Sequence, residues 1–455
     1  MKRLLYQLLR SKRETLGRDV KVSLLGLGTT NRAILEVLLP LDNVEISIRQ
    51  KEPIYSDLPR LVKVYQGNDA LTRIDDDVVI PSPSVRREKL SIPYEIDVIS
   101  DYDLLFRQRS KNLFLISGSD GKSTTTTLAS LMMNGGFSST FTGGNLGTPL
   151  INASIDTEAF ILELSSFTLR YSLPTGGRAL LTNVTPNHLD WHNGLEEYEE
   201  TKLSLIRHSD EPILNLDDTV LEREARRTQA FCLVSGTRTH SEISKSYRTE
   251  HTVTEENGYV NLDGKALIPI SEIKRKEKHN LSNFRSAVAM SIGYTDAAKI
   301  KDVAHAFQGL EERCEDFFID GVRYVSSSID TTPERTATTL IGLNREVNII
   351  LGGRGKRLPL EPLRLPLIKY AKRISLYGEA AEEMRDFIDS DEQLQSIPHQ
   401  SFSRLFDAID HATESVTSGD TVLLSPAATS YGEFRDYRHR GRFFKDRIVN
   451  KYGKI

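Results

Sequence analysis

Short apolar runs separated by helical patterns organise most of this chain. We predict strands over residues 21–25, 44–48, 78–80, 113–116, 160–166, 179–184, 347–351, 374–377 and 421–424. Apolar residues at helical spacing follow several of these runs, as at Ile34, Leu35 and Leu38. Strands that alternate with helices predict parallel sheets covered on their faces, so we expect an α/β protein.

Two further patterns predict elements outside this alternation. Residues 259–268 are typical of a β-hairpin that turns at Asp263-Gly264. Near the end of the chain, apolar side chains at helical spacing predict an amphipathic helix, whose apolar face we assign to the core. They are Phe402, Leu405, Phe406, Ile409, Ala412 and Val416.

The sequence of residues 112–124, Asn-Leu-Phe-Leu-Ile-Ser-Gly-Ser-Asp-Gly-Lys-Ser-Thr, predicts a phosphate-binding loop. Gly118 and Gly121 allow a tight turn whose backbone N–H groups face a phosphate. Lys122 adds a positive charge, and Ser123 or Thr124 can bind Mg²⁺. Two residues separate the glycines, where the general Walker form has four. The simpler alternative is an ordinary strand–turn–helix with a surface lysine.

Polar side chains end two of the strands predicted beyond this loop. Glu163 lies in the strand over residues 160–166, and His188 follows the strand over residues 179–184. Because the carboxyl ends of parallel strands share one edge of a sheet, both side chains are expected beside the phosphate loop and its metal. A lone histidine is ordinarily a surface or core residue, and only the position after a strand makes His188 a candidate.

The first strand leads into a Gly-x-Gly turn at Gly26 and Gly28. Asn31 stands where a dinucleotide fingerprint has its third glycine. The next strand ends in Arg49, where an acid would hold an adenosine ribose. The pattern is weak support for NAD, and a Rossmann-like domain without a ligand remains an alternative.

Composition narrows the class of protein. The 455 residues are enough for about three domains at ~150 residues each. A hydrophobic content of 38%, a charged content of 27% and a net charge of −4 are ordinary for a soluble protein and do not indicate a nucleic-acid partner. Cys232 and Cys314 are too few for a disulfide framework. The first residues predict a short helix that is too charged for a signal peptide, and no apolar run approaches the ~18 residues of a membrane span.

Taken together, these motifs resemble those of the Mur ligase family over almost the whole chain. The family-level marks lie at residues 118–124, 144–147 (Gly-Asn-Leu-Gly), 163–167 (Glu-Leu-Ser-Ser-Phe), 183–190 (Asn-Val-Thr-Pro-Asn-His-Leu-Asp), 198–203 and 279–283. The members that add D-glutamate are suggested by residues 163–167, by Leu-Gly-Gly-Arg-Gly-Lys at 351–356, and by Leu-Ser-Pro-Ala-Ala-Thr-Ser at 424–430 with Phe434 and Tyr437.

The resemblance implies three domains. Residues 1–105 would form a Rossmann-like domain that binds a UDP-sugar. Residues 106–308 would form a central P-loop ATPase-type parallel sheet with a small antiparallel appendage, which binds ATP and Mg²⁺. Residues 309–455 would form a Rossmann-like domain that brings the amino acid. The implied reaction adds D-glutamate to UDP-N-acetylmuramoyl-L-alanine through an acyl phosphate, in peptidoglycan synthesis for the cell wall. We expect a cytoplasmic monomer without nucleic acid.

Single residues take implied roles only where they match the family motifs. Catalytic roles fall to Lys122, His188 and Lys202. The ATP contacts would be Gly118, Ser119, Asp120, Gly121, Lys122, Ser123, Thr124, Asn283 and Arg313. The metal ligands would be Ser123, Glu163, His188 and Lys202. The substrate contacts would be Thr29, Thr30, Asn145, Thr331, Lys356, Ser430 and Tyr437, of which Asn145 serves the muramoyl group and the last four serve D-glutamate.

The neighbours of Lys202 and the resemblance predict different roles for it. Glutamates at 196, 197, 199 and 200 favour a solvated lysine in i,i+3 pairs. The family modifies the matching lysine to a carbamate, and that change gives an anion able to support Mg²⁺.

This chain departs from the family pattern at several positions. Ser327 and Ile329 stand where an acid and a lysine are usual, so a nucleotide contact is lost or relocated, with Asp330 as one candidate. Glu312 replaces the usual histidine before Arg313, and Arg49 replaces an acid at the end of a strand. Two alternatives stay open: a related ligase acting on another acid and amine, and a non-catalytic sugar-nucleotide binder.

Overall fold

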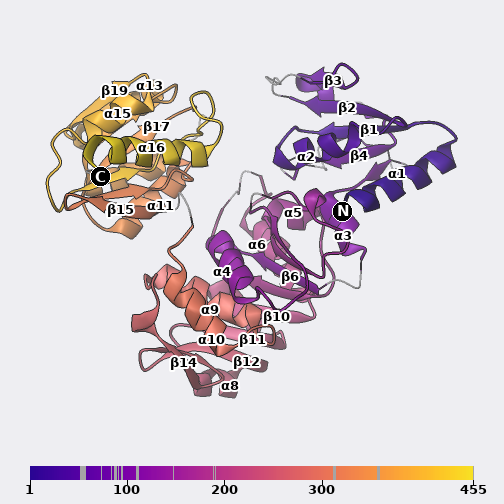
Figure 1. The fold of residues 1–455 in the computed structure, drawn as a ribbon, viewed down its shortest axis with the longest axis horizontal. Helices are drawn as coiled ribbons and strands as arrows, with labels where there is room; N and C mark the ends of the chain where they lie inside the picture. The colour runs from indigo at the N-terminus through magenta and orange to yellow at the C-terminus, as the bar shows by residue number, and fades with distance from the viewer. Residues whose placement is uncertain are drawn as a thin grey trace. The chain divides into compact units, whose positions relative to one another are not determined.

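A computed structural model describes residues 1–51, 58–72, 74–83, 85–86, 90, 92–93, 96–108, 112–146, 148–187, 189, 191–310, 314–355 and 359–453. The chain divides into two compact units, residues 1–307 (unit 1) and 308–455 (unit 2). Unit 1 contains two β-sheets and unit 2 contains a third. The prediction of an α/β protein is confirmed, since parallel strands dominate all three sheets and helices cover them (Figure 1).

The first sheet of unit 1 is a five-stranded parallel sheet in the order β3-β2-β1-β4-β5. Its strands are β1 (Val20–Leu25), β2 (Val44–Gln50), β3 (Lys63–Gln66), β4 (Val78–Pro81) and β5 (Asp97–Val98). The leading helix α1 (Lys2–Leu16) and the helix α2 (Thr29–Leu38) pack against β1. Apolar side chains of both helices bury against this sheet, as the periodicity predicted, and Asn31 fastens the turn after β1 by donating to the carbonyls of Leu25, Gly26 and Ile80.

The second sheet of unit 1 has nine strands in the order β14-β13-β12-β11-β10-β9-β6-β8-β7. The strands are β6 (Asn112–Ser117), β7 (Thr140–Gly144), β8 (Ala159–Glu163), β9 (Arg178–Leu181), β10 (Glu211–Asn215), β11 (Ala230–Ser235), β12 (Thr249–Glu256), β13 (Tyr259–Leu262) and β14 (Lys265–Pro269). The helices are α3 (Asp101–Phe106), α4 (Lys122–Met132), α5 (Ser166–Tyr171), α6 (Leu195–Arg207), α7 (Thr219–Ala225), α8 (His240–Ser246), α9 (Lys278–Ser291) and α10 (Ala297–Ala306). The strands β6 to β12 run parallel, which places β6 in the interior of the sheet.

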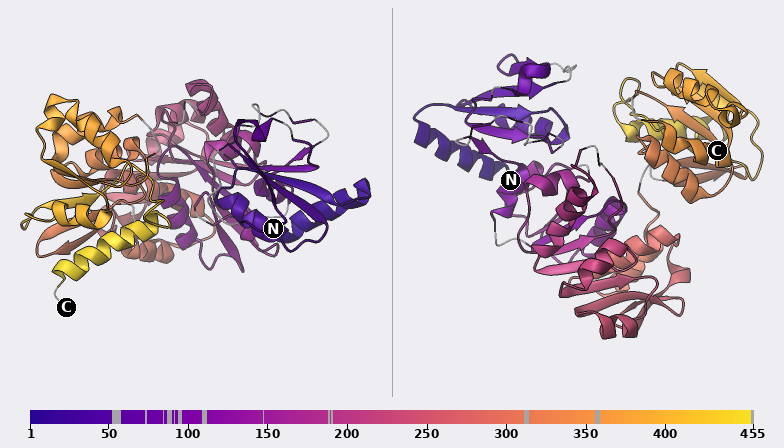
Figure 2. Two further views of the ribbon diagram at one scale, coloured as in Figure 1. Left: turned by 90° about the horizontal axis from the view of Figure 1, so that it is seen from above. Right: turned by 180° about the vertical axis from the view of Figure 1, so that it is seen from behind.

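The antiparallel end of this sheet confirms the predicted hairpin. Strands β13 and β14 pair antiparallel, and β13 also pairs antiparallel with β12. Asp263 and Gly264 form the turn with φ of 52° and 74°, the left-handed conformation that a two-residue hairpin turn requires. The hairpin lies with α8 at the end of the sheet away from β6 (Figure 2).

The sheet of unit 2 has six strands in the order β15-β16-β20-β17-β18-β19. Its strands are β15 (Glu315–Ile319), β16 (Val322–Ser326), β17 (Val347–Gly352), β18 (Ala371–Tyr377), β19 (His399–Phe402) and β20 (Thr421–Leu424), and only β15 pairs antiparallel. The helices are α11 (Pro333–Leu343), α12 (Arg364–Tyr370), α13 (Ala381–Asp389), α14 (Glu392–Gln395), α15 (Leu405–Ala412) and α16 (Tyr437–Tyr452).

The amphipathic helix predicted over residues 402–416 was partly wrong. Phe402 ends strand β19 and pairs with Tyr377, so helix α15 begins only at Leu405. Phe406 is 39% exposed and lies under the guanidinium of Arg447, whose Cζ is 3.8 Å from the ring centroid. Phe402 still packs against the core of unit 2, as predicted, whereas Phe406 does not. The start of the helix was wrong because periodicity does not show where a strand ends and a helix begins.

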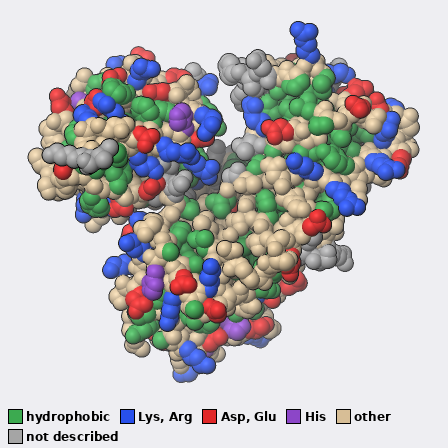
Figure 3. Space-filling model, in the orientation of Figure 1, with side chains coloured by type: hydrophobic (Ala, Val, Ile, Leu, Met, Phe, Trp, Pro, Cys, Tyr) green, Lys and Arg blue, Asp and Glu red, His purple; other side chains and the backbone are tan. Residues whose placement is uncertain are grey.

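The outer surface shows no dominance of one charge on the face that Figure 3 draws. Lysine and arginine side chains are interspersed with aspartate and glutamate over each unit. Within the described part of the chain, no helix is both long and apolar enough to cross a bilayer.

Candidate active site

Three strands of the nine-stranded sheet end at one edge. The registers pair Ile116 of β6 with Glu163 of β8, and Ser117 of β6 with Leu181 of β9. Helix α4 begins at Lys122, directly after the loop of residues 118–121. The loop, Glu163 and the segment after β9 therefore meet at the edge that the sequence predicted.

Two glycines shape the loop. Gly118 and Gly121 have φ of 143° and 79°, in the region that favours glycine. A Cβ atom on Gly118 would collide with the hydroxyl of Thr182, and one on Gly121 would collide with the amide oxygen of Asn283. The loop thus packs without side chains against β9 and α9, with the amino end of α4 aimed at the same space, as an anion cradle requires.

Lys122 folds back over the loop. Its Nζ atom donates to the carbonyls of Gly118 at 3.0 Å and Ser119 at 2.6 Å. The side chain is half-buried, so Lys122 is not the surface lysine of an ordinary strand–turn–helix. Lys122 therefore stabilises the loop through these two carbonyls, and the same side chain is available to bind a phosphate.

Side chains that follow β9 and begin α6 hold the loop from outside. The Ser119 hydroxyl lies 2.7 Å from the Tyr198 hydroxyl and donates to the Thr185 carbonyl at 2.9 Å. The Asp120 N–H donates to Asn183 Oδ1 at 2.9 Å, and Thr182 Oγ1 donates to the Asp120 carbonyl at 2.6 Å. Thr182 had no predicted role, because the strand predicted over residues 179–184 included it. Strand β9 ends at Leu181, so Thr182 is the first residue of the loop that follows.

Lys202 is buried at this edge, with 1% of its surface exposed. Its Nζ atom donates to the Gly118 carbonyl at 2.8 Å and lies 4.9 Å from the centroid of the Tyr198 ring. Burial lowers the pKa of Lys202 well below its usual value, and repulsion from Lys122 lowers it further. The explanation based on neighbouring glutamates is wrong, because Lys202 lies on the buried side of α6.

Glu163 is the buried carboxylate of the site. Its Oε1 atom accepts from Asn145 Nδ2 at 3.0 Å. Its Oε2 atom is buried and has no hydrogen-bond partner. An orphaned carboxylate oxygen beside a phosphate loop is a suitable ligand for Mg²⁺. No cluster of three or more histidine, cysteine or acidic side chains that could hold a metal occurs in the described ranges, which exclude His188.

The remaining loop residues divide into exposed and enclosed positions. Ser123 is half-buried at the start of α4, whereas Thr124 is buried. Asn283 of α9 is buried, and its Oδ1 atom is 3.4 Å from Thr125 Oγ1. Asn283 thus reaches the loop from α9, a helix distant in sequence, and only the family resemblance had given it a role there.

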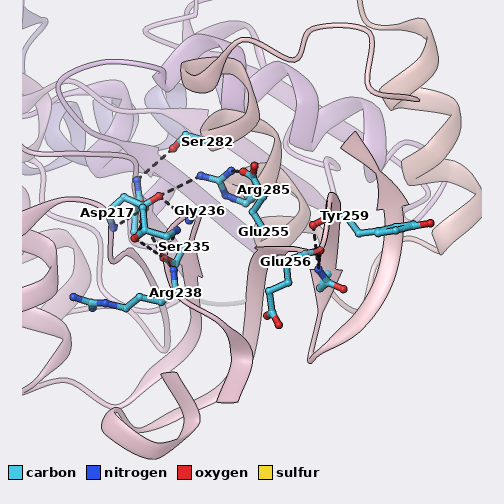
Figure 4. A network of polar contacts seen from close by, with 12 residues as sticks. Asp217, Ser235, Gly236, Arg238, Glu255, Glu256, Tyr259, Ser282 and Arg285 are labelled. Atoms are coloured by element: carbon cyan, nitrogen blue, oxygen red, sulfur yellow. Dashed lines mark hydrogen bonds and ion pairs between the residues drawn. The ribbon is translucent and has the colours of Figure 1, made fainter. Parts of the chain in front are cut away.

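A polar network fixes the orientation of α9 (Figure 4). Arg285, two residues after Asn283, is buried; its Nη1 donates to Glu255 at 2.6 Å and its Nη2 lies 3.2 Å from Asp217. Burial lowers the pKa of Arg285, and the two carboxylates oppose that shift. Asp217 also accepts from the N–H of Gly236 at 2.8 Å. The network joins α9 to the ends of β10, β11 and β12.

A second cluster of predicted site residues lies at the strand ends of unit 2. Thr331 follows β16, Ser430 follows β20, and Tyr437 begins α16. The Ser328 hydroxyl donates to the Tyr437 carbonyl at 2.8 Å. Arg440 is fully buried below these loops, where its guanidinium donates to the carbonyls of Ser328 and Ala428. These contacts fix the loops to one another.

The departures in unit 2 have structural consequences. Ser327 is fully buried, and its carbonyl accepts from the Asp330 N–H. Asp330 is buried, and its Oδ2 accepts from Thr339 at 2.7 Å and from Ser425 at 2.8 Å. Oδ2 of Asp330 thus bonds two hydroxyls within unit 2, and the relocation of a nucleotide contact to Asp330 stays a prediction.

Several predicted residues lie outside the described part of the chain. They are His188, Arg313 with Glu312, and Lys356. The backbone of Thr29 begins α2, but its side chain is not described, whereas Thr30 is half-buried in the first turn of that helix.

Comparisons with known proteins agree with this arrangement. Residues 116–291 match the family described as Mur ligase middle domain. The UDP-N-acetylmuramoylalanine–D-glutamate ligase of Clostridium beijerinckii is 30% identical over 443 residues, which cover 94% of this chain and 96% of that protein. The enzyme of the same name from Acetivibrio thermocellus is 30% identical over 455 residues, which cover 95% and 97%.

Solved structures show the same fold at low sequence identity. UDP-N-acetylmuramate–alanine ligase of Thermotoga maritima has a TM-score of 0.59 and 16% identity, covering 95% of this chain and 100% of that one. A ligase of Acinetobacter baumannii, which by its name joins D-alanyl-D-alanine, has a TM-score of 0.52, 12% identity and coverage of 97% and 98%. With relatives this similar over nearly their full length, the chain belongs to the Mur ligase family.

Proposed function

We propose that this chain is an ATP-dependent ligase that adds D-glutamate to UDP-N-acetylmuramoyl-L-alanine in peptidoglycan precursor synthesis. The similar enzymes named above support the substrates. One observation in the site carries the chemistry: the phosphate loop closes over a buried lysine, Lys202, beside a buried carboxylate with an orphaned oxygen, Glu163. We assign the reaction to the cytoplasm and to a monomer.

The domain roles follow the same assignment. Residues 1–105 bind the UDP-sugar, with Thr29 and Thr30 at the turn after β1. Residues 106–308 bind ATP through residues 118–124 with Asn283, and Arg313 of the following domain adds a contact. Residues 309–455 bind the amino acid. The loop after β6, Thr30 after β1 and Ser430 after β20 follow parallel strands, and this position supports the assignments because α/β proteins bind their ligands there.

The loop supplies binding and charge for the ATP phosphates. The glycines let a phosphate approach the backbone, and the amino end of α4 adds a partial positive charge. Lys122 needs only to turn from the carbonyls of its own loop to face a γ-phosphate. Its charge offsets the negative charge that builds on the phosphoryl oxygens while the substrate carboxylate attacks.

The donor set also fits Mg²⁺. Glu163, Ser123 and His188, with Lys202 as its carbamate, would hold the ion, and the orphaned oxygen of Glu163 is the observation that fits it. Mg²⁺ bound there supplies positive charge next to the phosphates. Asn145 orients Glu163 by its hydrogen bond and lies where it can also contact the muramoyl group.

Lys202 is suited to the modification that this set requires. A neutral amine nitrogen attacks the carbon of CO₂, loses a proton and becomes a carbamate anion. The lowered pKa favours the neutral amine that this attack requires, and burial excludes the water that would stabilise its charge. The Tyr198 ring and the Gly118 carbonyl enclose the nitrogen.

The acyl phosphate is then open to the amine of D-glutamate. Phosphorylation turns a poor electrophile into one with a good leaving group. We assign recognition of D-glutamate to Thr331, Lys356, Ser430 and Tyr437 in unit 2. Lys356 would pair with the side-chain carboxylate, so D-glutamate is expected to react faster than D-glutamine.

Phosphate release from ATP tests the proposal. The purified chain is given Mg²⁺, ATP, a panel of UDP-muramoyl acceptors and a panel of D- and L-amino acids. We expect release only with UDP-N-acetylmuramoyl-L-alanine and D-glutamate together. Phosphate release with another acid and amine would show that the chain is a related ligase with other substrates. No phosphate release with any pair would indicate a non-catalytic binder.

Lys122→Ala tests the phosphate loop in the same assay. Loss of a positioned cation is expected to lower turnover by at least about 100-fold. Lys301→Ala on the exposed face of α10 is the matched control and should leave turnover unchanged. Near-normal turnover of Lys122→Ala would remove Lys122 from the reaction, and the thermal unfolding midpoint of both variants reports any damage to the loop.

A further inference from the structure

We propose that His192 is a positioning residue of the ligase reaction, which ties the segment after Glu163 to the helix that carries Lys202. The inference rests on the proposed function and adds to it a residue that the reaction itself does not touch. His192 lies in the segment between β9 and α6, and it is buried with 2% of its surface exposed. Neither its sequence position nor a family motif gave it a role.

The two ring nitrogens of His192 face two different helices. Nε2 lies 3.0 Å from the hydroxyl of Ser166, the first residue of α5 and the third after Glu163. Nδ1 lies 3.5 Å from Oε1 of Glu197 in the first turn of α6. Five residues further along α6 is Lys202. A single imidazole thus links the carboxylate strand to the helix with the buried amine.

The chemistry of these partners assigns the tautomer. Nδ1 makes no hydrogen bond at 3.5 Å, and the nearby carboxylate of Glu197 favours the ring proton on this nitrogen. Nε2 is then an acceptor, and the Ser166 hydroxyl donates to it. Burial lowers the pKa of His192, Lys202 and Arg170 lower it further, and Glu197 opposes them. The ring therefore stays neutral under physiological conditions and keeps both contacts.

The faces of the ring extend the link to the phosphate loop. Tyr198 packs edge-on against His192 at 5.2 Å between centroids, and the Tyr198 hydroxyl reaches Ser119 of the loop. On other sides, Trp191 lies at 4.7 Å and Phe167 at 6.2 Å. His192 is therefore packed where α5, α6 and the loop converge, and no other histidine in the described ranges is as buried.

The consequence concerns distance within the site. Glu163 and Lys202 come from separate elements, and their separation depends on how α5 and α6 are joined. If the joint loosens, the groups that bind ATP remain while the charges around the γ-phosphate shift. Because misplacement by about 1 Å costs up to ~100-fold in rate, turnover should fall while substrate binding changes little.

A double-mutant cycle tests the link through Ser166. His192→Phe keeps the ring packing but removes both nitrogens, and Ser166→Ala removes the hydroxyl. We expect each variant to lower kcat by about 10-fold, with KM for ATP and for the muramoyl substrate within about two-fold of the unmodified chain. The double variant should be no slower than His192→Phe, because in that background the Ser166 hydroxyl has already lost its contact with Nε2.

Two further variants complete the design. His208→Phe replaces an exposed histidine that follows α6, and it should leave kcat unchanged. His192→Gln keeps a carboxamide that can donate to Glu197 or accept from Ser166, so it should recover part of the lost kcat. If His192→Phe does not fold, as judged by its unfolding midpoint, the comparison of His192→Gln with Ser166→Ala decides.

The outcomes separate this inference from the proposed function. A His192→Phe kcat within two-fold of the unmodified chain overturns the positioning role, as do Ser166 and His192 effects that multiply. A fall in kcat with an equal rise in both KM values also overturns it, since that result indicates general damage to the site. Absence of turnover in the unmodified chain overturns the proposed function itself, and the inference with it.

Discussion

Two buried basic side chains of unit 1 differ in their partners. Lys202 has a backbone carbonyl and the face of an aromatic ring around its nitrogen, and no ion pair with an acid is found for it within the described residues. Arg285 lies between the carboxylates of Asp217 and Glu255 (Figure 4). Both side chains are almost completely buried and both belong to helices next to the phosphate loop.

The difference in partners distinguishes a residue that can react from a residue that stabilises the fold. A guanidinium cannot be deprotonated under ordinary conditions, so a buried one needs acceptors, which are two acids for Arg285 and backbone carbonyls for Arg440. An amine has the second option of losing its proton, and the environment of Lys202 favours that option. Lys202, buried without an ion pair among the described residues, is the residue suited to react, and Arg285, buried with two ion pairs, holds a helix in place.

Removal of Lys202 should have the largest effect. Lys202→Ala is expected to lower ligation by at least about 100-fold, because the anion that supports Mg²⁺ is lost. High concentrations of formate should restore part of the activity by occupying the vacated space. Lys202→Arg should not respond to formate, since its guanidinium fills the space with the wrong charge. Full activity of Lys202→Ala without added acid would contradict the assignment of Lys202 as the reactive residue.

Arg285 should affect stability more than chemistry. Arg285→Ala leaves the partly exposed carboxylates of Asp217 and Glu255 without their cation, and it is expected to lower the free energy of unfolding by about 1.5–3 kcal/mol. The control is a triple variant, Arg285→Met with Asp217→Asn and Glu255→Gln. It removes all three charges together and keeps the volume of the side chains similar. That triple variant should unfold near the original midpoint in urea. If Arg285→Ala is as stable as the unmodified chain, the network does not anchor α9.

Asp101 is an acid whose pKa is shifted by burial, as the pKa of the base Lys202 is. It is buried, its Oδ2 accepts from the Ile151 N–H at 3.2 Å, and desolvation raises its pKa to about 6. A raised pKa means that the folded state holds a proton which the unfolded state has lost. The contribution of Asp101 to stability is thus complete below about pH 4 and lost as the pH rises through about 6.

Replacement by asparagine isolates this contribution. Asp101→Asn keeps the acceptor for Ile151 and cannot ionise. Its stability relative to the unmodified chain should rise between about pH 4 and 6 and reach a plateau of up to about 3 kcal/mol above that range. Thermal unfolding midpoints at several pH values give the difference curve. A flat curve would mean that the carboxylate is solvated.

The smallest effect is expected at Gly236. A Cβ atom there would collide with Nη2 of Arg285, a side chain that its two acids do not let move freely. Gly236→Ala should therefore cost about 1 kcal/mol of stability. The same change in the Arg285→Met background should cost less, because a thioether chain can yield. Equal costs in the two backgrounds would show that Arg285 is not held in place.

The elements of the site were predictable where local pattern decides them. The strand before the phosphate loop, the helix after it and Glu163 at the next strand end follow from apolar runs and glycine spacing, and each lies where it was expected. The hairpin at Asp263-Gly264 is equally local. Such features depend on the conformations that a few adjacent residues allow.

The partners of buried polar groups were not predictable in this way. The glutamates around Lys202 describe one side of α6, and its burial depends on contacts with Gly118, 84 residues away. The contact of His192 with Ser166 spans 26 residues, and Asp330 is paired with Ser425 across 95. One sequence carries no record of such pairs, because each depends on how separate elements pack. The helix predicted from Phe402 failed for a related reason: pairing of β19 with β18 decided its start.

The chain contains a single tryptophan, Trp191, whose ring lies 4.4 Å from that of Phe167 and next to His192. Its ultraviolet emission therefore reports from one place, the junction of α5 and α6, without any attached label. Emission colour follows the polarity around the indole, so water entering the junction would shift it to longer wavelength. Trp191 is thus a built-in fluorescence probe of the segment between Glu163 and Lys202.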